Sequence, residues 1–361
     1  VTSAEITVGK PVVTNADGLG TLTVPIDARP QGVPLAGEFV AELGEKGGIR
    51  LRLNLRNVGE KTMVPRVRFP LVRDIRMGSV EETWYLYARK GGVISNRPFH
   101  ERKASGGEYP LQVLDVFRAD GGGVAMLTED TVGSYRFWEL AKDEQGVDIG
   151  IDYWEREYAP GEALETVPTV LRAHTGDWRR ALALYREWVQ TWYRAQSPRQ
   201  PWMQDVYYYQ QTVIGRIRDR QTGAWRIPET IQTYRDYFGC LDYLHIFDFG
   251  ASPTYGRVGD YSHYEENGGL AGMQKAFRQV QDSGVRLGLY MEGYLCDERS
   301  VWGRDRVSSL DIRKQDGKPL LWPGTPSEHM MCTATAGWRE HLATTYKRVA
   351  GELRPDGLYI D

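Results

Sequence analysis

The chain has 361 residues, of which 41% are hydrophobic and 26% are charged, and its formal net charge is −3. That length predicts about two domains with a full hydrophobic core. The small net charge implies neither nucleic acid nor an acidic membrane surface as a partner, and no apolar run approaches the ~18 residues of a membrane span. No signal peptide is visible, but the sequence begins with Val1 rather than Met, which indicates processing or trimming and leaves secretion open.

The first part of the sequence, residues 1–176, has the pattern of a β domain. Short apolar segments are separated by glycine-rich turns, and residues 50–56 alternate strictly between apolar and polar side chains. Leu51, Leu53 and Leu55 therefore share one face of a strand. Many short strands with frequent turns predict an antiparallel β-sandwich.

Residues 177–201 predict a linking helix followed by a short linker. Asp177 is placed to cap the helix, and its apolar residues recur at helical spacing. Trp178, Trp188 and Trp192 fall on this stripe. We expect these rings to pack between domains rather than to form a platform for a ligand.

From residue 202 to residue 361 the pattern changes to strands that alternate with helices. The expected strands are 206–214, 243–249, 286–290 and 358–360. Such alternation implies a parallel sheet, here the first half, about four βα units, of a TIM-type (β/α)8 barrel. Because four parallel strands cannot close, we expect the missing C-terminal half of the barrel to come from the same chain or from a second chain.

One connection in this second part is far longer than a usual βα loop of ~2–6 residues. Residues 291–334 follow the third expected strand and contain Trp302 and Trp322. Long loops at this end of a barrel are usually functional. We therefore expect a lid or substrate wall, with Trp302 or Trp322 contacting the substrate.

The three cysteines cannot all pair. Cys240 ends an expected helix, whereas Cys296 and Cys332 both lie in the long loop. A bridge between these two is possible, because spacing alone does not decide connectivity, but packed thiols are the favoured interpretation.

Acidic residues follow three of the expected strands, at Asp248, Glu292 and Asp361. The carboxyl ends of barrel strands meet at one face, so we expect these carboxylates to point into a common bowl, with Tyr290 and Tyr294 beside them. The alternative is that each acid caps a helix or pairs with an arginine. Two carboxylates on either side of a glycosidic bond suffice for most glycoside hydrolysis, and this chemistry needs no cofactor. The 21 Tyr and 11 Trp, against 9 Phe, would also suit sugar faces, although core packing explains them equally well.

Other site classes lack their motifs. The sequence has no dinucleotide-binding glycine pattern, no phosphate-binding loop and no serine nucleophile elbow. Residues 328–332 could supply metal ligands, but no second cluster completes a site, so no metal is expected. His245 lies inside a strand, which favours a hydrogen-bonded core histidine. The arginine-rich stretch 216–220 is most simply a solvated loop.

Three segments carry a resemblance to a known family. Residues 176–188, 331–342 and 356–361 resemble the bacterial glycoside-hydrolase-like proteins that have a β-sandwich followed by a (β/α)8 barrel, which are similar to the α-galactosidase clan and to endo-α-N-acetylgalactosaminidases. The resemblance implies a glycoside hydrolase that acts on an oligo- or polysaccharide. The rival interpretation is a carbohydrate-binding or surface-structural protein on a degenerate scaffold of the same kind.

The resemblance also implies roles for particular residues. In that clan the Asp that ends the fourth strand is the nucleophile of a retaining mechanism, a role that falls on Asp361. The acid/base comes from a later strand, beyond residue 361, with Glu292 as the reserve candidate. Asp248 and Glu292 match strand-end positions used for sugar hydroxyls. The fragment alone is expected to be inactive because it lacks half of the bowl.

Overall fold

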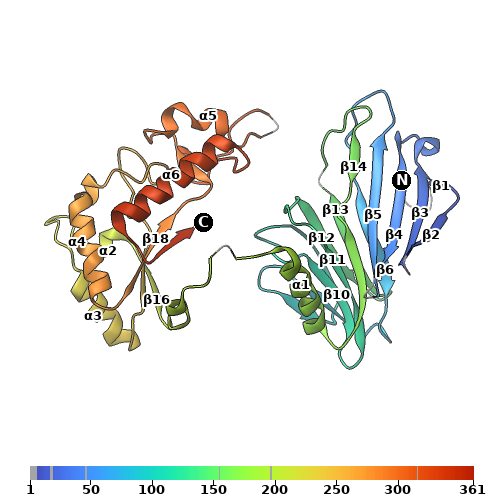
Figure 1. The fold of residues 1–361 in the computed structure, drawn as a ribbon, viewed down its shortest axis with the longest axis horizontal. Coiled ribbons are helices and arrows are strands. Elements are labelled where there is room, and N and C mark those ends of the chain that lie inside the picture. The colour runs from blue at the N-terminus through green and yellow to red at the C-terminus, as the bar shows by residue number, and fades with distance from the viewer. Residues whose placement is uncertain (1–5, 17–18, 45–46, 154, 196, 315) are drawn as a thin grey trace. The chain divides into compact units, whose positions relative to one another are not determined.

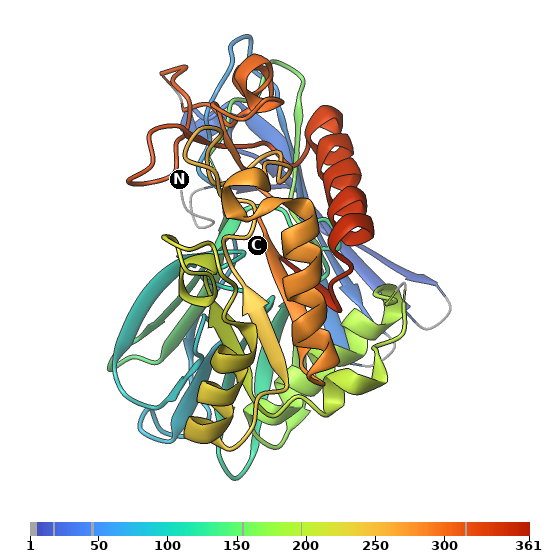
Figure 2. The ribbon, with the colours of Figure 1, turned by 90° about the vertical axis from the view of Figure 1, so that its left-hand side faces the viewer.

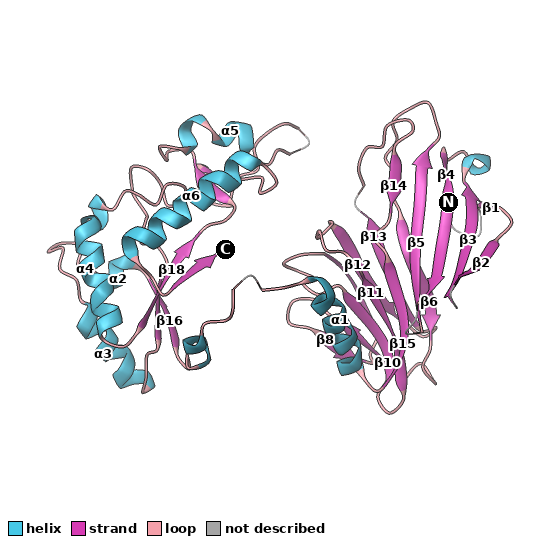
Figure 3. Ribbon diagram, viewed as in Figure 1, coloured by secondary structure: helices cyan, strands magenta, loops and turns pink. Residues whose placement is uncertain are grey.

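The computed structural model describes residues 6–361 apart from 17–18, 45–46, 154, 196 and 315. The chain divides into two compact units, Val1–Gln196 and Ser197–Asp361. In the described part, the first unit is built mainly from strands and also carries the helix α1 (Trp178–Trp192), whereas the second combines strands with several helices, as Figure 3 shows by colour. No helix of the described residues is long and apolar enough to cross a membrane.

The first unit holds two antiparallel sheets (Figure 1). In the described residues the larger sheet has eleven strands: β1 (Thr7–Val8), β2 (Val12–Ala16), β3 (Leu19–Asp27), β4 (Leu35–Leu43), β5 (Gly48–Asn57), β7 (Thr83–Tyr87), β8 (Val93–Ser95), β10 (Val113–Arg118), β11 (Gly122–Thr128), β14 (Ala163–Glu165) and β15 (Thr169–Thr175). The smaller, four-stranded as described, consists of β6 (Arg68–Ile75), β13 (Val147–Tyr153), β12 (Arg136–Lys142) and β9 (Phe99–Ala104), in that order. A short 3₁₀ helix, η1 (Arg29–Gln31), follows β3.

The two sheets share one hydrophobic core. Tyr87 and Val113 of the larger sheet are fully buried together with Trp138 of the smaller one, whose ring stacks on Tyr109 at 5.2 Å. The expected β-rich first half is thus confirmed. In β5, Leu51 and Leu55 are buried and Leu53 is partly buried, as the alternating pattern predicts.

The helix α1 (Trp178–Trp192) packs on the larger sheet of this unit. Its N-cap is Asp177, whose carboxylate accepts a hydrogen bond from Arg179 N at 3.0 Å. Ala181 and Leu184 are its buried residues, and Trp178 packs against the same core. That the tryptophans of α1 pack between domains stays a prediction.

The second unit is organised around a parallel sheet whose strands follow one another in chain order: β16 (Tyr209–Thr212), β17 (Tyr243–Ile246), β18 (Arg286–Met291) and β21 (Gly357–Ile360). The α/β character of this half is thereby confirmed. The first strand was expected to reach residue 214, which is wrong. It ends at Thr212, and Ile214 begins the short helix α2 (Ile214–Ile217).

The two faces of this sheet differ, because side chains alternate along each strand. One face is aliphatic and buried, with Leu244, Ile246 and Leu289 all inaccessible to solvent. It packs against α3 (Ile227–Phe238), α4 (Gly269–Asp282) and α6 (Ala336–Leu353). Figure 2 shows α4 lying between α3 and α6.

The opposite face is aromatic. Tyr290 and Tyr359 stack there at 5.6 Å, and Tyr243 lies across two neighbouring strands. A Cβ at Gly288 would lie 2.3 Å from the Tyr243 ring, and one at Gly357 would lie 2.6 Å from its hydroxyl. These glycines therefore make room for the ring. Here the Tyr243 ring fills space that branched aliphatic side chains usually fill in the interior of a barrel.

The long loop after β18 is partly structured. Its elements are β19 (Leu295–Asp297), the 3₁₀ helix η4 (Gly303–Asp305), α5 (Val307–Leu310) and β20 (Glu328–Met330), with β19 and β20 forming an antiparallel pair. Two further 3₁₀ helices in this unit are η2 (Pro201–Gln204) and η3 (Glu265–Asn267).

Candidate active site

Two carboxylates meet at the carboxyl ends of the neighbouring strands β18 and β21. Tyr290 Oη lies 2.7 Å from Glu292 Oε1 and 2.5 Å from Asp361 Oδ2. Residues two apart on a strand share a face, and β18 pairs with β21. The side chain of Tyr290 therefore lies beside both Glu292 and Asp361. A phenol has a single proton to donate. Both contacts can be hydrogen bonds only if one of the two carboxyl groups carries a proton itself.

Burial indicates which carboxyl group that is. Glu292 is 3% exposed, whereas Asp361 is exposed to solvent. Burial raises the pKa of Glu292, and the negative charge of Asp361 raises it further, against the lowering effects of Tyr290 and Arg257. The pKa of Tyr290 is raised too, chiefly by burial and then by its two acidic partners. A proton on Glu292 would let its carboxyl group donate to Tyr290 Oη while the Tyr290 hydroxyl donates to Asp361 Oδ2.

Arg257 connects this pair to the long loop. Its guanidinium binds Glu328 in a bidentate manner, with N–O distances of 3.1 and 2.8 Å, and its Nη1 lies 3.6 Å from Glu292 Oε1. Glu328 belongs to β20, so one arginine holds the β19–β20 pair beside the carboxylates. The Glu292 backbone is fixed as well, since its N–H donates to Tyr261 Oη and its carbonyl accepts from Tyr346 Oη.

The long loop also supplies an aromatic wall. The Trp322 ring lies 6.0 Å from the Tyr294 ring in an edge-to-face arrangement, and Trp322 is 37% exposed. Tyr294 directly follows Gly293, whose backbone N–H donates to the Asp361 carbonyl oxygen at 2.9 Å, so this residue lies next to the end of β21. Burial raises the pKa of Tyr294, and the negative charges of Glu292 and Asp361 raise it further. Trp322 and Tyr294 therefore offer the flat surfaces that suit a sugar ring beside the carboxylates.

Asp248 lies elsewhere on the same sheet edge. Its Oδ1 accepts a hydrogen bond from Ile214 N at 2.7 Å, at the start of α2. It lines a separate pocket of about 470 Å³. In the described residues no hydrogen bond or ion pair joins it to Glu292 or Asp361, so its position fits the alternative in which the acid caps a helix.

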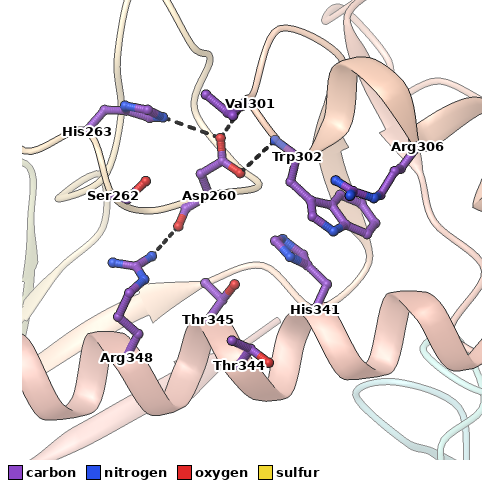
Figure 4. A pocket seen from close by; sticks show the side chains of 10 residues that line it. All are labelled: Asp260, Ser262, His263, Val301, Trp302, Arg306, His341, Thr344, Thr345 and Arg348. Carbon is purple, nitrogen blue, oxygen red and sulfur yellow. Dashed lines mark hydrogen bonds and ion pairs between the residues drawn. The ribbon is translucent and has the colours of Figure 1, made fainter.

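Trp302 lines another pocket, of about 480 Å³ (Figure 4). Its ring stacks on His341 at 4.0 Å, and its backbone N–H donates to the Asp260 carboxylate at 3.1 Å. Figure 4 shows His341 beside this ring and Thr345 further along the same helix, α6, which forms one side of the pocket. Contact of Trp302 with a substrate stays a prediction.

A family model described as "Domain of unknown function (DUF6259)" matches residues 165–361. The chain belongs to this DUF6259 family. The matched segment contains the whole parallel sheet and both joined carboxylates. No curated protein sequence matches the chain.

Solved structures with the same fold are glycosidases. The ligand-free α-N-acetylgalactosaminidase NagBb from Bifidobacterium bifidum is 13% identical with a TM-score of 0.71, over 98% of this chain and 62% of that one. Its complex with Gal-NHAc-DNJ gives a TM-score of 0.73 at 14% identity, over 98% and 61%. The GH36 α-galactosidase AgaA from Geobacillus stearothermophilus is 11% identical with a TM-score of 0.54, over 98% and 52%. The expected resemblance to a glycoside-hydrolase-like fold is confirmed, and the DUF6259 chain spans about 62% of the length of NagBb.

Other expectations for this DUF6259 chain can be compared with its structure. His245 is 3% exposed and its Nδ1 is hydrogen-bonded to Tyr209 Oη, as expected of a core histidine. Cys240, Cys296 and Cys332 are all free, so the interpretation as unbridged thiols is confirmed. In the described residues no group of three or more His, Cys, Asp or Glu could hold a metal ion.

Sequence reasoning missed two groups of the site. Arg257 comes from the loop after β17 and gave no signal, since single arginines in loops are common. Glu328 was weighed only as a metal ligand, whereas its carboxylate pairs with Arg257.

Proposed function

We propose that this chain carries the nucleophile half of a retaining glycoside hydrolase that acts on an oligo- or polysaccharide. The observation that carries the proposal is the Tyr290 hydroxyl, which joins Glu292 and Asp361 at the carboxyl ends of two adjacent parallel strands. This is the end at which barrels carry their catalytic groups. The glycosidase fold of the solved neighbours supports it.

In this mechanism Asp361 attacks the anomeric carbon of the substrate. The Tyr290 hydroxyl donates a hydrogen bond to Asp361 Oδ2, which leaves Oδ1 as the oxygen that attacks. The bond from the anomeric carbon to the leaving oxygen breaks, and that oxygen takes a proton from an acid placed about 5–5.5 Å from the nucleophile. The same group then removes a proton from water, which attacks the anomeric carbon and releases Asp361. No cofactor takes part.

Glu292 is the reserve candidate for the acid, since its raised pKa suits a proton donor. Its Oε1 is engaged by Tyr290, and its Oε2 is buried without a hydrogen-bond partner in the described residues. This burial favours an acid/base from a later strand, with Glu292 helping to position Asp361 through the Tyr290 hydroxyl.

The sheet itself favours a larger barrel. Its outermost strands are β16 and β21, and the aromatic face is open there, with Tyr209 46% and Tyr359 52% exposed. Residues 202–361 would be the first half of a (β/α)8 barrel, after a β-sandwich over 1–176 and a connection over 177–201. Further strands, from the same chain or a second one, would complete it and supply the acid/base.

The activities named for the solved neighbours make α-linked galactose and N-acetylgalactosamine the first sugars to assay. In the complete protein, Asp361→Asn keeps the shape of the side chain but removes the nucleophile, so turnover of a nitrophenyl α-glycoside should fall by orders of magnitude while sugar binding survives. Asp282→Asn, at an exposed carboxylate at the end of α4, is the matched control. Equal turnover by Asp361→Asn and the parent would make Asp361 structural. Sugar binding without hydrolysis by the parent would favour the carbohydrate-binding alternative.

A further inference from the structure

A second pocket opens beyond the carboxyl ends of β16 and β17. It has a volume of about 470 Å³, and its charged lining consists of Arg218, Arg220, Asp248 and Glu266. The two arginines belong to the stretch that the sequence predicts to be a solvated loop. That prediction is wrong for Arg218, which is half-buried and reaches the pocket.

Neither guanidinium has an acidic partner. In the described part of the chain, the ion pairs include neither Arg218 nor Arg220. Asp219, which lies between them in sequence, pairs instead with Arg226 and accepts hydrogen bonds from two backbone N–H groups of its own turn. The Nε of Arg218 is buried and lacks a hydrogen-bond partner among the described residues, which is costly unless a ligand supplies an acceptor.

The two acids of the pocket are occupied in part by other groups. Asp248 Oδ1 accepts from Ile214 N at 2.7 Å, and Glu266 Oε1 accepts from Thr254 Oγ1 at 3.2 Å. Among the described residues their second carboxylate oxygens have no hydrogen-bond partner, so they can accept from hydroxyl groups of a ligand. The pocket therefore presents guanidinium donors and carboxylate acceptors that do not neutralise one another by direct pairing.

Glycines leave room for the guanidinium groups. A Cβ at Gly215 would lie 3.0 Å from Arg220 Nη2, and one at Gly223 would lie 3.0 Å from Arg218 Nη2. At Gly268 the Cβ would lie 3.1 Å from Arg218 Nε. Both guanidinium groups therefore lie close against backbone, and that of Arg218 also lies over the Trp225 ring, 5.9 Å from its centroid.

The pocket and the joined carboxylates lie at the same edge of one sheet. With neighbouring strands about 4.8 Å apart, β17 lies about 10 Å and β16 about 14 Å from β21, which carries Asp361. Because both features lie at this one edge, a single saccharide is the simplest ligand for the two of them.

We propose that Arg218 and Arg220 form a subsite for an anionic substituent, a carboxylate or a sulfate ester, on a saccharide whose hydroxyl groups bind Asp248 and Glu266. This inference rests on the proposed function, since it names the substrate class of the same sheet edge. Guanidinium groups bind carboxylate and sulfate oxygens with paired, charge-assisted hydrogen bonds, whereas a neutral sugar would leave them unpaired.

The test is calorimetric titration of the complete protein with glucuronic acid, galactose 6-sulfate and neutral galactose. At least one acidic sugar should bind about tenfold or more tightly than galactose, a difference of about 1.4 kcal/mol, and its affinity should fall as salt increases. Whether the uronate or the sulfated sugar binds more tightly distinguishes the two anionic groups.

Three variants sharpen the test. The double variant Arg218→Ala with Arg220→Ala should bind the acidic sugar about 10- to 100-fold more weakly. The double replacement by lysine, which keeps the charge and the fold but loses the paired geometry, should recover only part of the affinity. Arg216→Ala is the matched control, because Arg216 is an exposed residue of α2 that does not line the pocket, and the variant should bind like the parent.

Equal binding of acidic and neutral sugars by the parent, no binding of either acidic sugar, or unchanged acidic-sugar affinity in the alanine double variant would each overturn the proposal. The proposed function fails separately: a parent that binds the acidic sugar through these arginines but hydrolyses no glycoside would keep the subsite and remove the nucleophile role of Asp361.

Discussion

The hydroxyl group of Tyr290 is the feature whose removal tests the joined carboxylates most simply. Tyr290 is 6% exposed, and its Oη contacts Glu292 at 2.7 Å and Asp361 at 2.5 Å. Tyr290→Phe keeps the ring and removes both contacts. Glu292, 3% exposed, would then keep Arg257 at 3.6 Å as its side-chain partner in the described residues.

The magnitude follows from these contacts. A hydrogen bond to a charged group contributes about 1.5–3 kcal/mol, so we expect Tyr290→Phe to lower the free energy of unfolding of the second unit by about 2–3 kcal/mol at neutral pH. Since 1.4 kcal/mol is a factor of ten, amides of β18 and β21 that exchange through this unfolding should exchange about 30- to 140-fold faster.

Hydrogen exchange followed by mass spectrometry on peptides from β18 and β21 measures this effect in the second unit alone. Tyr359→Phe is the matched control, since its ring stacks on Tyr290 but is 52% exposed, and it should change stability by less than about 0.5 kcal/mol. Equal exchange rates in the two variants would refute the shared hydrogen bond.

Three further predictions concern the same site. Because the native pKa of Glu292 is raised, its native form binds a proton more tightly than the unfolded chain, so its contribution to stability is present at low pH and is lost as pH rises above its ordinary pKa of about 4.3. Glu292→Gln cannot titrate and should lose less stability on raising the pH than the parent, measured by thermal unfolding across a pH series; parallel curves would contradict this. Trp322→Ala should weaken saccharide binding, measured by calorimetry, without unfolding the protein. The same measurement on Trp302→Ala decides whether the pocket lined by Trp302 also contacts sugar. Unchanged affinity in both variants would make the two tryptophans packing residues. Gly293→Ala places a Cβ 2.8 Å from the Asp361 carbonyl oxygen, so it should destabilise the second unit by about 1–3 kcal/mol and lower turnover, and a variant as stable and active as the parent would show that the strand end can shift freely.

The parallel sheet could be predicted because short, mostly apolar runs alternate with helices of regular period, although β16 itself carries two glutamines. The ends of such runs also located Glu292 and Asp361. Their meeting follows from side-chain alternation: Tyr290 and Glu292 are two residues apart, as are Tyr359 and Asp361, and the register pairs the two tyrosines.

The same rule explains why Asp248 does not join them. Tyr243, His245 and Phe247 occupy alternate positions, and the Phe247 ring lies 4.1 Å from the Tyr290 ring on the aromatic face. Asp248 is one position further along and hydrogen-bonds to Ile214 N instead. Counting positions along the strand, rather than noting an acid at its end, would have separated it from the other two.

Arg257 and the arginine pocket could not be predicted from local pattern. Arg257 meets Glu328 across 71 residues of sequence, and that contact depends on how the long loop folds back. The sequence around Arg218 and Arg220 has the composition of any charged loop. Only the structure shows that Asp219, which lies between them, forms its ion pair with Arg226. Long-range pairing, not composition, decides which charges remain free for a ligand.

The central claim is that Asp361 is the nucleophile, and trapping the covalent intermediate tests it most directly. The complete protein would be incubated with an activated 2-fluoro glycoside, which slows the second step of a retaining reaction, and then digested for mass spectrometry. We predict a glycosyl adduct on the peptide that contains Asp361 and its absence in Asp361→Asn. An adduct on Glu292 or another carboxylate, or hydrolysis with inversion at the anomeric carbon, would contradict the account.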